Sequence, residues 1–256
     1  MKTGAIIQAR MGSTRLHGKI LKPLGDKPVL WHVVNRVGQC RRVDHVIVAT
    51  TIEPEDDITA DFCRENRFDC FRGSSDDVLD RFYRAALAFG IDHIVRITAD
   101  CPVIDPVIVD EVIEMYFWEK YDVCRPGPEF PDGLDCGIFS FKTLKYVWRN
   151  ATLPSDREHI SPYMEKHPEI FRVGMHEKYK GLAHLRWTLD EDADYRFLQE
   201  IFLRLYKPGE IFYADDILSV LEREPHLSDI NSWITRNEGY LKSLRQDESF
   251  RKQREI

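Results

Sequence analysis

The residues best able to do chemistry lie in one short loop near the N-terminus. The segment AIIQARMGSTRLHGKIL, residues 5–21, begins as an apolar run and continues into a loop that contains Arg10, Gly12, Ser13, Arg15, Gly18 and Lys19. Arginine binds phosphate through two parallel hydrogen bonds, lysine acts as a point charge, and glycine lets backbone amides approach an anion closely. The loop therefore fits a phosphate-bearing ligand, although a solvated basic loop has the same composition.

The loop does not follow the sequence of the common nucleotide-binding loops. A Walker A loop needs four residues between its glycines and a hydroxyl residue after its lysine. Here five residues separate Gly12 from Gly18, and Ile20 follows Lys19. The G-x-G-x-x-G pattern of dinucleotide-binding loops is also missing. Binding by side-chain cations is the interpretation that remains, because open α/β sheets bind ligands beyond the carboxyl ends of their strands.

Two aspartates follow apolar runs elsewhere in the chain. Asp100 comes just after DHIVRIT, and Asp190 ends LRWTLD. Mg²⁺ is bound by one or two carboxylates together with phosphate oxygens and water. The two aspartates are therefore predicted to be metal ligands at the sheet edge that carries the cationic loop. A lone aspartate after a strand is commonly a turn or cap residue, and Asp192 and Asp194 fit capping of the next helix better.

Alternating segments are expected to position these groups. The first half predicts strands at 4–9, 45–51, 68–71 and 92–98, and helices at 28–38, over PEDDITADFCREN, at 77–89 and at 106–119. The second half predicts strands within 132–141, over PEIFRVG and at 185–190, then a helix at 193–206 and a charged helical tail from Asp215. Alternation of this kind predicts right-handed crossovers and a largely parallel sheet covered by helices.

The composition excludes several classes of function. The 256 residues carry a net charge of −7, which argues against a broad nucleic-acid or membrane surface. No segment approaches the roughly 18 consecutive apolar residues of a membrane span, and the N-terminus has no signal-peptide pattern. The six cysteines include no C-x-x-C pair. A reduced, cytoplasmic protein is the expectation.

The motifs resemble the cytidylyltransferases of the spore coat polysaccharide biosynthesis protein F type, which are relatives of acylneuraminate and 3-deoxy-manno-octulosonate cytidylyltransferases. The matching segments, in chain order, are IIQARMGSTRL.GK.LKPLG, VATT..PEDD, FRGS.DDVLDR, VRIT.DCP.IDP, PDGLD, REH.SPY, LR.TLD and NEGYLKSL. The resemblance implies an α/β, Rossmann-like, glycosyltransferase-A-type nucleotidyltransferase fold with a mainly parallel central sheet. Residues 1–212 would form the nucleotidyltransferase domain and residues 213–256 a helical C-terminal appendage.

The resemblance also implies an activity and its partners. Such enzymes transfer CMP from CTP to a sugar or sugar-acid-like acceptor and release pyrophosphate, with Mg²⁺ as cofactor and commonly as homodimers. The nucleotide would be bound by Ala9, Arg10, Gly12, Ser13, Arg15, Lys19, Arg72, Gly73 and Ser74, with Asp77 and Arg81 in support. Arg10, Lys19 and Asp100 would be catalytic, and Asp100 and Asp190 would bind the metal. The acceptor would be bound by Asp135, Glu158 and His159, although His159 is equally well read as a hydrogen-bonded helix residue.

The chain departs from the resembled pattern at two positions, and two other functions stay open. His17 stands where relatives usually have proline, and Gly137 lies where they tend to carry an acidic residue, which argues against a standard acidic-sugar acceptor. A glycosyltransferase that uses a nucleotide sugar is one alternative, because residues 190–192 spell D-x-D. A non-catalytic nucleotide-binding homologue is the other. The cationic loop suits a triphosphate better than a diphosphate sugar, and both predicted metal ligands are present.

Overall fold

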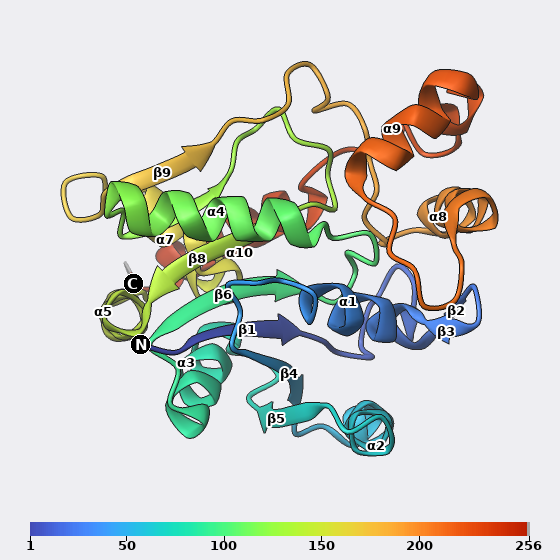
Figure 1. Ribbon diagram of the computed structural model, residues 1–256. Coiled ribbons are helices and arrows are strands. Elements are labelled where there is room, and N and C mark those ends of the chain that lie inside the picture. The colour runs from blue at the N-terminus through green and yellow to red at the C-terminus, as the bar shows by residue number, and fades with distance from the viewer. Residues whose placement is uncertain (255–256) are drawn as a thin grey trace.

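The computed structural model describes residues 1–254, which form an α/β protein built on one seven-stranded sheet (Figure 1). The strands in chain order are β1 (Thr3–Gln8), β4 (His45–Thr51), β5 (Asp69–Gly73), β6 (His93–Thr98), β7 (Val123–Pro126), β8 (Cys136–Ser140) and β9 (Val173–His176). In space their order is β5-β4-β1-β6-β8-β7-β9. β8 is antiparallel to β6 and β7, and the other neighbouring pairs are parallel. The predicted Rossmann-like class with a mainly parallel sheet is confirmed.

Helices cover both faces of the sheet. They are α1 (Val29–Val37), α2 (Asp57–Glu65), α3 (Val78–Phe89), α4 (Pro106–Glu119), α5 (Phe141–Asn150), α6 (Pro154–His159), α7 (Ser161–Glu165), α8 (Asp192–Leu205), α9 (Ala214–Arg223) and α10 (Glu238–Arg254). Short 3-10 turns lie at η1 (Lys19–Leu21), η2 (Pro54–Asp56) and η3 (Pro225–Ile230), and β2 (Pro23–Leu24) pairs with β3 (Lys27–Pro28). The start of α4 follows the expected rule, because Asp105 accepts a hydrogen bond from the Val107 amide and proline comes first in the helix.

The side-chain alternation of β1 separates two hydrophobic cores. Ala5 and Ile7 face the layer of α1, α4 and α8, whereas Ile6 faces the layer of α3 and α5. Figure 1 shows α4 and α3 on opposite sides of the sheet. Because both faces are covered, apolar residues follow one another in the middle of β1, at residues 5–7. Since β1, β4, β5 and β6 are parallel, their carboxyl ends lie at one edge of the sheet.

Two expected strands differ from the structure. Residues 185–190 form no ladder and make only a single bridge, between Arg186 and Asp132. Trp187 and Leu189 are nevertheless buried in the core. Residues 185–189 are all buried, so the apolar alternation of the sequence occurs here without strand pairing. The strand expected over PEIFRVG begins only at Val173, since the amides of Ile170 and Phe171 both donate to the His167 carbonyl in a turn.

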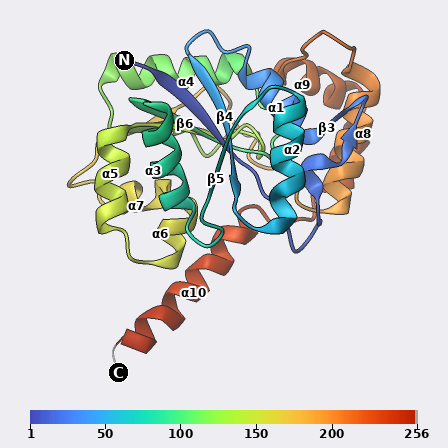
Figure 2. The ribbon, with the colours of Figure 1, turned by 90° about the horizontal axis from the view of Figure 1, so that it is seen from below.

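The last part of the chain has two different relationships to the sheet. α9 packs Ala214, Ile217 and Val220 into the same core as α1 and α4. α10 contacts α6 through its buried residues Ser243 and Asp247, and its C-terminal end projects beyond the body of the molecule (Figure 2). The expected boundary at 212/213 comes just before α9. Division of the chain there stays a prediction.

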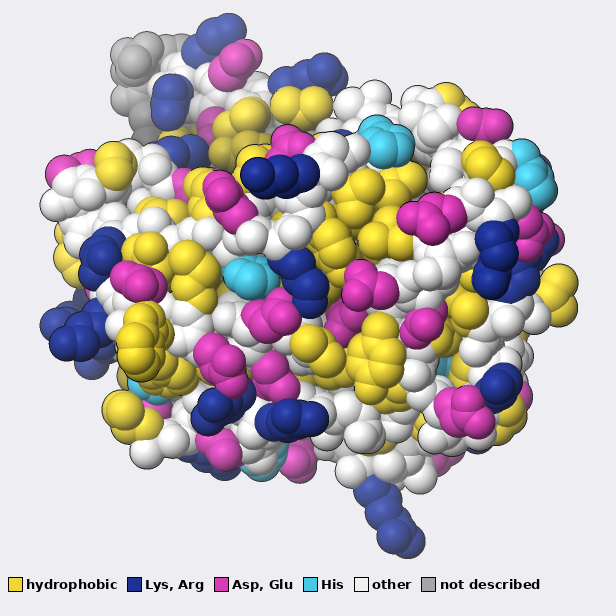
Figure 3. All heavy atoms as spheres, turned by 45° about the horizontal axis from the view of Figure 1, so that its top comes forward, with side chains coloured by type: hydrophobic (Ala, Val, Ile, Leu, Met, Phe, Trp, Pro, Cys, Tyr) yellow, Lys and Arg dark blue, Asp and Glu magenta, His cyan; other side chains and the backbone are white. Residues whose placement is uncertain are grey.

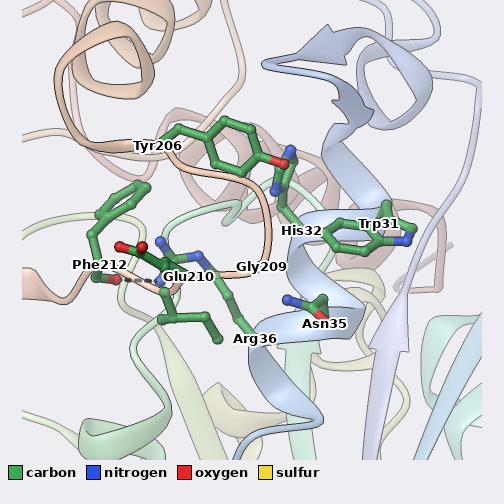
Figure 4. A pocket seen from close by; sticks show the side chains of 9 residues that line it. Trp31, His32, Asn35, Arg36, Tyr206, Gly209, Glu210 and Phe212 are labelled. Atoms are coloured by element: carbon green, nitrogen blue, oxygen red, sulfur yellow. Dashed lines mark hydrogen bonds between the residues drawn. The ribbon is translucent and has the colours of Figure 1, made fainter.

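A small pocket lies where α1 meets the segment before α9 (Figure 4). Arg36 of α1 is buried and donates to the Phe212 carbonyl at 2.7 Å, while the His32 ring packs against Phe202 and Tyr206. The volume of this pocket is about 20 Å³. Since that is room for little more than a water molecule, the pocket serves packing rather than ligand binding.

The surface offers no wide basic field on the face seen in Figure 3, where acidic and basic side chains are interspersed. Within residues 1–254, no helix is both long and apolar enough to cross a bilayer.

Candidate active site

A cleft of about 950 Å³ opens at the carboxyl ends of β1 and β6. Ten of the predicted site residues line it, namely Arg10, Gly12, Ser13, Arg15, Lys19, Asp100, Asp135, Glu158, His159 and Asp190. The cationic loop, the end of β6, α6 and the first turns of α10 thus meet around one space. That volume is in the range of small-molecule sites.

The loop after β1 is shaped so that Lys19 points into this cleft. The amides of Ser13 and Gly18 both donate to the Met11 carbonyl, which folds the loop back on itself. Gly18 has φ 65°, a left-handed conformation that glycine adopts without steric cost, and the 3-10 turn η1 begins directly after it. Lys19, the first residue of η1, is buried against the sheet edge.

Lys19 bridges the two aspartates that the sequence paired. Its Nζ donates to Asp100 Oδ2 at 2.7 Å and to Asp190 Oδ1 at 2.6 Å. Burial alone would lower the pKa of Lys19, but the two carboxylates outweigh it and raise the pKa. Burial likewise opposes ionisation of Asp190, yet Lys19 and Arg15 lower its pKa to about 2. Lys19 and Asp190 are therefore both charged near neutral pH.

The same carboxylates fit a divalent cation. Asp100 and Asp190 both contact the ammonium group of Lys19, so their carboxylates are close enough to share one cation. Such hard oxygen donors are the ligands that Mg²⁺ prefers. Within residues 1–254, no cluster of three or more His, Cys, Asp or Glu side chains is arranged to hold a metal. A magnesium ion there would need phosphate oxygens and water as further ligands, which is its usual coordination in phosphoryl-transfer sites. Mg²⁺ stays a prediction.

Arg15 and Arg10 connect the loop to other walls of the cleft. Arg15 forms ion pairs with Asp190 at 2.9 Å, with Glu191 at 3.3 Å and with Glu238 of α10 at 3.4 Å. Arg10 lies 3.8 Å from Glu158, and about half of its side chain is exposed. Arg15 is thus engaged on three sides, whereas Arg10 keeps most of its donors free for a ligand.

The D-x-D sequence at residues 190–192 does not gather three carboxylates. Asp190 faces Lys19, Glu191 lies at the N-terminus of α8, and Asp192 is exposed in the first helical turn. Asp194 accepts hydrogen bonds from the amides of Asp190 and Glu191, which confirms its expected capping role.

Arg186 is a residue that sequence reasoning missed. Its guanidinium donates to both oxygens of Asp194, to Asp132 at 2.9 Å and to Asp190 at 3.4 Å. Through these hydrogen bonds Arg186 holds the segment that carries Asp190. The pKa of Asp132, one of its partners, is raised to about 7 by burial and by the neighbouring Asp135. The apolar alternation in LRWTLD predicted a strand and concealed this role.

The wall of the cleft where the acceptor was predicted to bind is built on α6. Glu158 accepts from Ser243 Oγ of α10 at 2.7 Å, and His159 Nε2 lies 3.1 Å from the same hydroxyl. Burial first, and the charge of Arg96 second, lower the pKa of His159 to about 4. His159 is thus a neutral, hydrogen-bonded residue that also lines the cleft. Asp135 accepts from the Gly133 amide at 3.1 Å.

Four predicted nucleotide-binding residues do not line the cleft, namely Ala9, Arg72, Gly73 and Ser74. Arg72 donates to the carbonyls of Thr51 and Glu53 and pairs with Asp57, so its charge is used beside α2. Arg81 donates to the Ser74 carbonyl at 2.6 Å and holds that segment.

The next residues, Ser75 and Asp76, do reach the cleft. Asp77 caps α3 and binds Arg157 of α6. Contact of a nucleotide with Ala9, Arg72, Gly73 and Ser74 stays a prediction.

Comparison with known proteins decides the family. A sequence model of the cytidylyltransferase family matches residues 4–217. The chain is also 32% identical over 228 residues to the spore coat polysaccharide biosynthesis protein SpsF of Bacillus subtilis, covering 86% of this chain and 94% of that protein. The chain belongs to the cytidylyltransferase family. The resemblance read from the motifs is confirmed, and this cytidylyltransferase is a nucleotidyltransferase.

Two further relatives mark the breadth of the similarity. A solved cytidylyltransferase from Leptospira borgpetersenii superimposes on this cytidylyltransferase with a TM-score of 0.84 at 34% identity, covering 89% of this chain and 97% of that one. The 3-deoxy-manno-octulosonate cytidylyltransferase of Geobacter sulfurreducens is 36% identical over 115 residues, which is 44% of each chain. Sequence similarity to that protein therefore spans less than half of either chain.

Proposed function

We propose that this cytidylyltransferase transfers CMP from CTP to a small sugar or sugar-acid-like acceptor in surface polysaccharide or glycoconjugate biosynthesis, with release of pyrophosphate. The observation that carries the proposal is the pair of ion pairs from Lys19 to Asp100 and Asp190 at the edge of the cleft. A buried lysine between two aspartates, next to a loop with two arginines, provides cations for a triphosphate and carboxylates for its metal.

The chemistry requires positioning more than covalent help. A hydroxyl of the acceptor attacks the α-phosphorus of CTP and releases its proton to water, a new O–P bond forms, and the bond to the bridging oxygen breaks in line so that pyrophosphate leaves. Arg10, Arg15 and Lys19 would neutralise the charge that gathers on the departing pyrophosphate. Asp100 and Asp190 would hold Mg²⁺, which when bound supplies positive charge at the phosphates. The acceptor would bind between α6 and Asp135.

The test is a pyrophosphate-release screen of the full chain with Mg²⁺. Each of the four common ribonucleoside triphosphates is combined with keto-acid sugars, other sugars and phosphonates. We expect release that depends on both CTP and an acceptor, and that is at least about tenfold slower with the other nucleotides. Release without an acceptor, or a preference for another triphosphate, would contradict the proposal.

The glycosyltransferase alternative is tested by the same preparation. Thermal shift with CTP against a panel of nucleotide sugars separates the two, because only a cytidylyltransferase site with loop cations should prefer the triphosphate. A homodimer is proposed on the resemblance alone, and sedimentation velocity tests it.

A further inference from the structure

Arg96 is a cationic side chain in the floor of the cleft whose charge has no partner. It lies in the middle of β6 and lines the cleft. Its Nε atom is buried without a hydrogen-bond partner, and the guanidinium makes no hydrogen bond or ion pair to any residue between 1 and 254. A guanidinium has five N–H donors and stays protonated in proteins. The cleft therefore contains a positively charged group that is free to bind an anion.

The neighbouring strands leave Arg96 without an acceptor. In the sheet register, Arg96 lies opposite Ile6 of β1 on one side and Gly137 of β8 on the other. Ile6 is apolar, and Gly137 has no side chain. A Cβ built at position 137 would find Ser161 Oγ at 3.7 Å as its nearest neighbour, which is ordinary van der Waals distance. A side chain at position 137 could therefore start without a clash, and Gly137 itself lines the cleft, so β8 offers Arg96 no side-chain acceptor.

The carboxylates around Arg96 are engaged elsewhere. Asp100 binds Lys19, Glu158 accepts from Ser243, and Asp135 accepts from a backbone amide of its own turn. Burial lowers the pKa of Arg96, and Asp100 and Asp135 partly offset that effect. A partly buried charge without a direct partner carries a desolvation penalty that an incoming anion would relieve.

We propose that Arg96 binds a carboxylate group of the acceptor and so selects sugar acids over neutral sugars, an inference that rests on the proposed function. A carboxylate matches the two-pronged guanidinium. A doubly charged phosphate or phosphonate suits the site less well, because Asp100, Asp135 and Glu158 would repel its second charge. The sequence alone took Gly137 as an argument against a standard acidic-sugar acceptor, but in the sheet register this glycine lies opposite Arg96 and leaves the guanidinium without a carboxylate partner, which favours an acidic acceptor. Arg96 and Gly137 then define the acceptor subsite, between the phosphate-binding loop and α6.

The first test is Arg96→Gln, measured in the pyrophosphate assay with CTP. Each sugar acid of the panel is assayed beside its neutral carboxamide. We expect the KM for the acid to rise about 100-fold, as for loss of a two-pronged ion pair. The KM for CTP should change by less than about threefold. Arg96→Lys, which keeps the charge but loses the fork, should lie between the wild type and Arg96→Gln.

Arg125→Gln is the matched control. Arg125 lines the same cleft, but it is already paired with both oxygens of Glu165, at 2.7 and 3.1 Å. The same chemical change should therefore alter the KM for the acid by less than about threefold. A loss equal to that of Arg96→Gln would show a general effect of charge in the cleft and would overturn the proposal.

Gly137→Glu tests the same idea without removing Arg96. A carboxylate at position 137 would lie opposite Arg96 in the sheet register, and a Cβ there meets its nearest neighbour, Ser161 Oγ, at 3.7 Å without a clash. It should raise the KM for the acid by about the same factor, with a melting temperature near that of the wild type. This variant keeps the proposal testable if Arg96→Gln does not fold.

Failure of this inference is distinct from failure of the proposed function. If the wild type uses a carboxamide or neutral sugar as well as the acid, or if Arg96→Gln and Gly137→Glu both leave the KM for the acid unchanged, the role of Arg96 is wrong while CMP transfer stands. If the wild type neither binds CTP nor releases pyrophosphate with any acceptor, the proposed function itself falls, and the role of Arg96 falls with it.

Discussion

The carboxylate of Asp247 caps the first turn of α6. It accepts hydrogen bonds from the backbone amide of Ser155 at 2.9 Å and from the Ser155 hydroxyl at 2.6 Å, although the two residues are 92 positions apart. Both residues are buried. Because α6 carries Glu158 and His159, the C-terminal helix holds in place the wall of the cleft where we expect the acceptor.

Replacing Asp247 by Ala should destabilise the protein by about 1–2 kcal/mol, the usual loss for a helix cap with buried partners. It should also raise the KM for the acceptor more than the KM for CTP. Chemical denaturation and initial rates measure the two effects. Glu248→Ala, an exposed change one residue further along α10, is the control and should leave both unchanged. Equal stability of the two variants would contradict the capping role.

Asp100→Asn should lower kcat by at least about 100- to 1000-fold while the fold is retained, because we expect the Asp100 carboxylate to hold the Mg²⁺ that stabilises the transition state. Pyrophosphate release and circular dichroism measure these. Asp192→Asn is the matched control, since Asp192 belongs to the D-x-D sequence but is exposed on α8. A larger loss in Asp192→Asn than in Asp100→Asn would favour the glycosyltransferase alternative.

Lys19→Ala should weaken binding of CTP by at least about tenfold more than binding of CMP, because we place its charge beside the outer phosphates. Calorimetric titration of each nucleotide gives the two ratios. Lys22→Ala changes a nearby lysine whose ammonium lies 5.2 Å from the Tyr195 ring, and it should affect both nucleotides equally. Equal losses for CTP and CMP in Lys19→Ala would show that Lys19 does not contact the outer phosphates.

His159 should make stability depend on pH. Its pKa is lowered to about 4 in the folded protein, compared with about 6.5 in an unfolded chain. The unfolded state therefore takes up a proton first, and stability is lost as the pH falls from about 6.5 to 4. The loss should be about 3 kcal/mol at most. Urea unfolding at pH 7 and pH 4.5 should show a smaller difference for His159→Gln than for the wild type. The same pH dependence in both proteins would assign the effect to other groups.

The order of strands and helices could be predicted from the sequence, because it depends on local periodicity and caps. β1, β4, β6, α3 and α4 lie within a few residues of their expected bounds. Since parallel strands share one carboxyl edge, the same reasoning brought the cationic loop and Asp100 to a common cleft. Asp190 was placed correctly although its strand was wrong, because residues 185–190 lead to the edge of the cleft without pairing.

Only the tertiary structure decided which side chains meet. Lys19 and its two aspartates are 81 and 171 positions apart, and no local pattern encodes that one lysine binds both. Arg72 pairs with Asp57 beside α2, which no local pattern indicated, and its contact with a nucleotide stays a prediction. Arg96 gained its importance from a register that puts a glycine opposite it. By itself the sequence determined the elements and the chemistry available at their ends. Packing between distant segments decided which charges are satisfied and which stay open to a ligand, because register and burial depend on the whole chain.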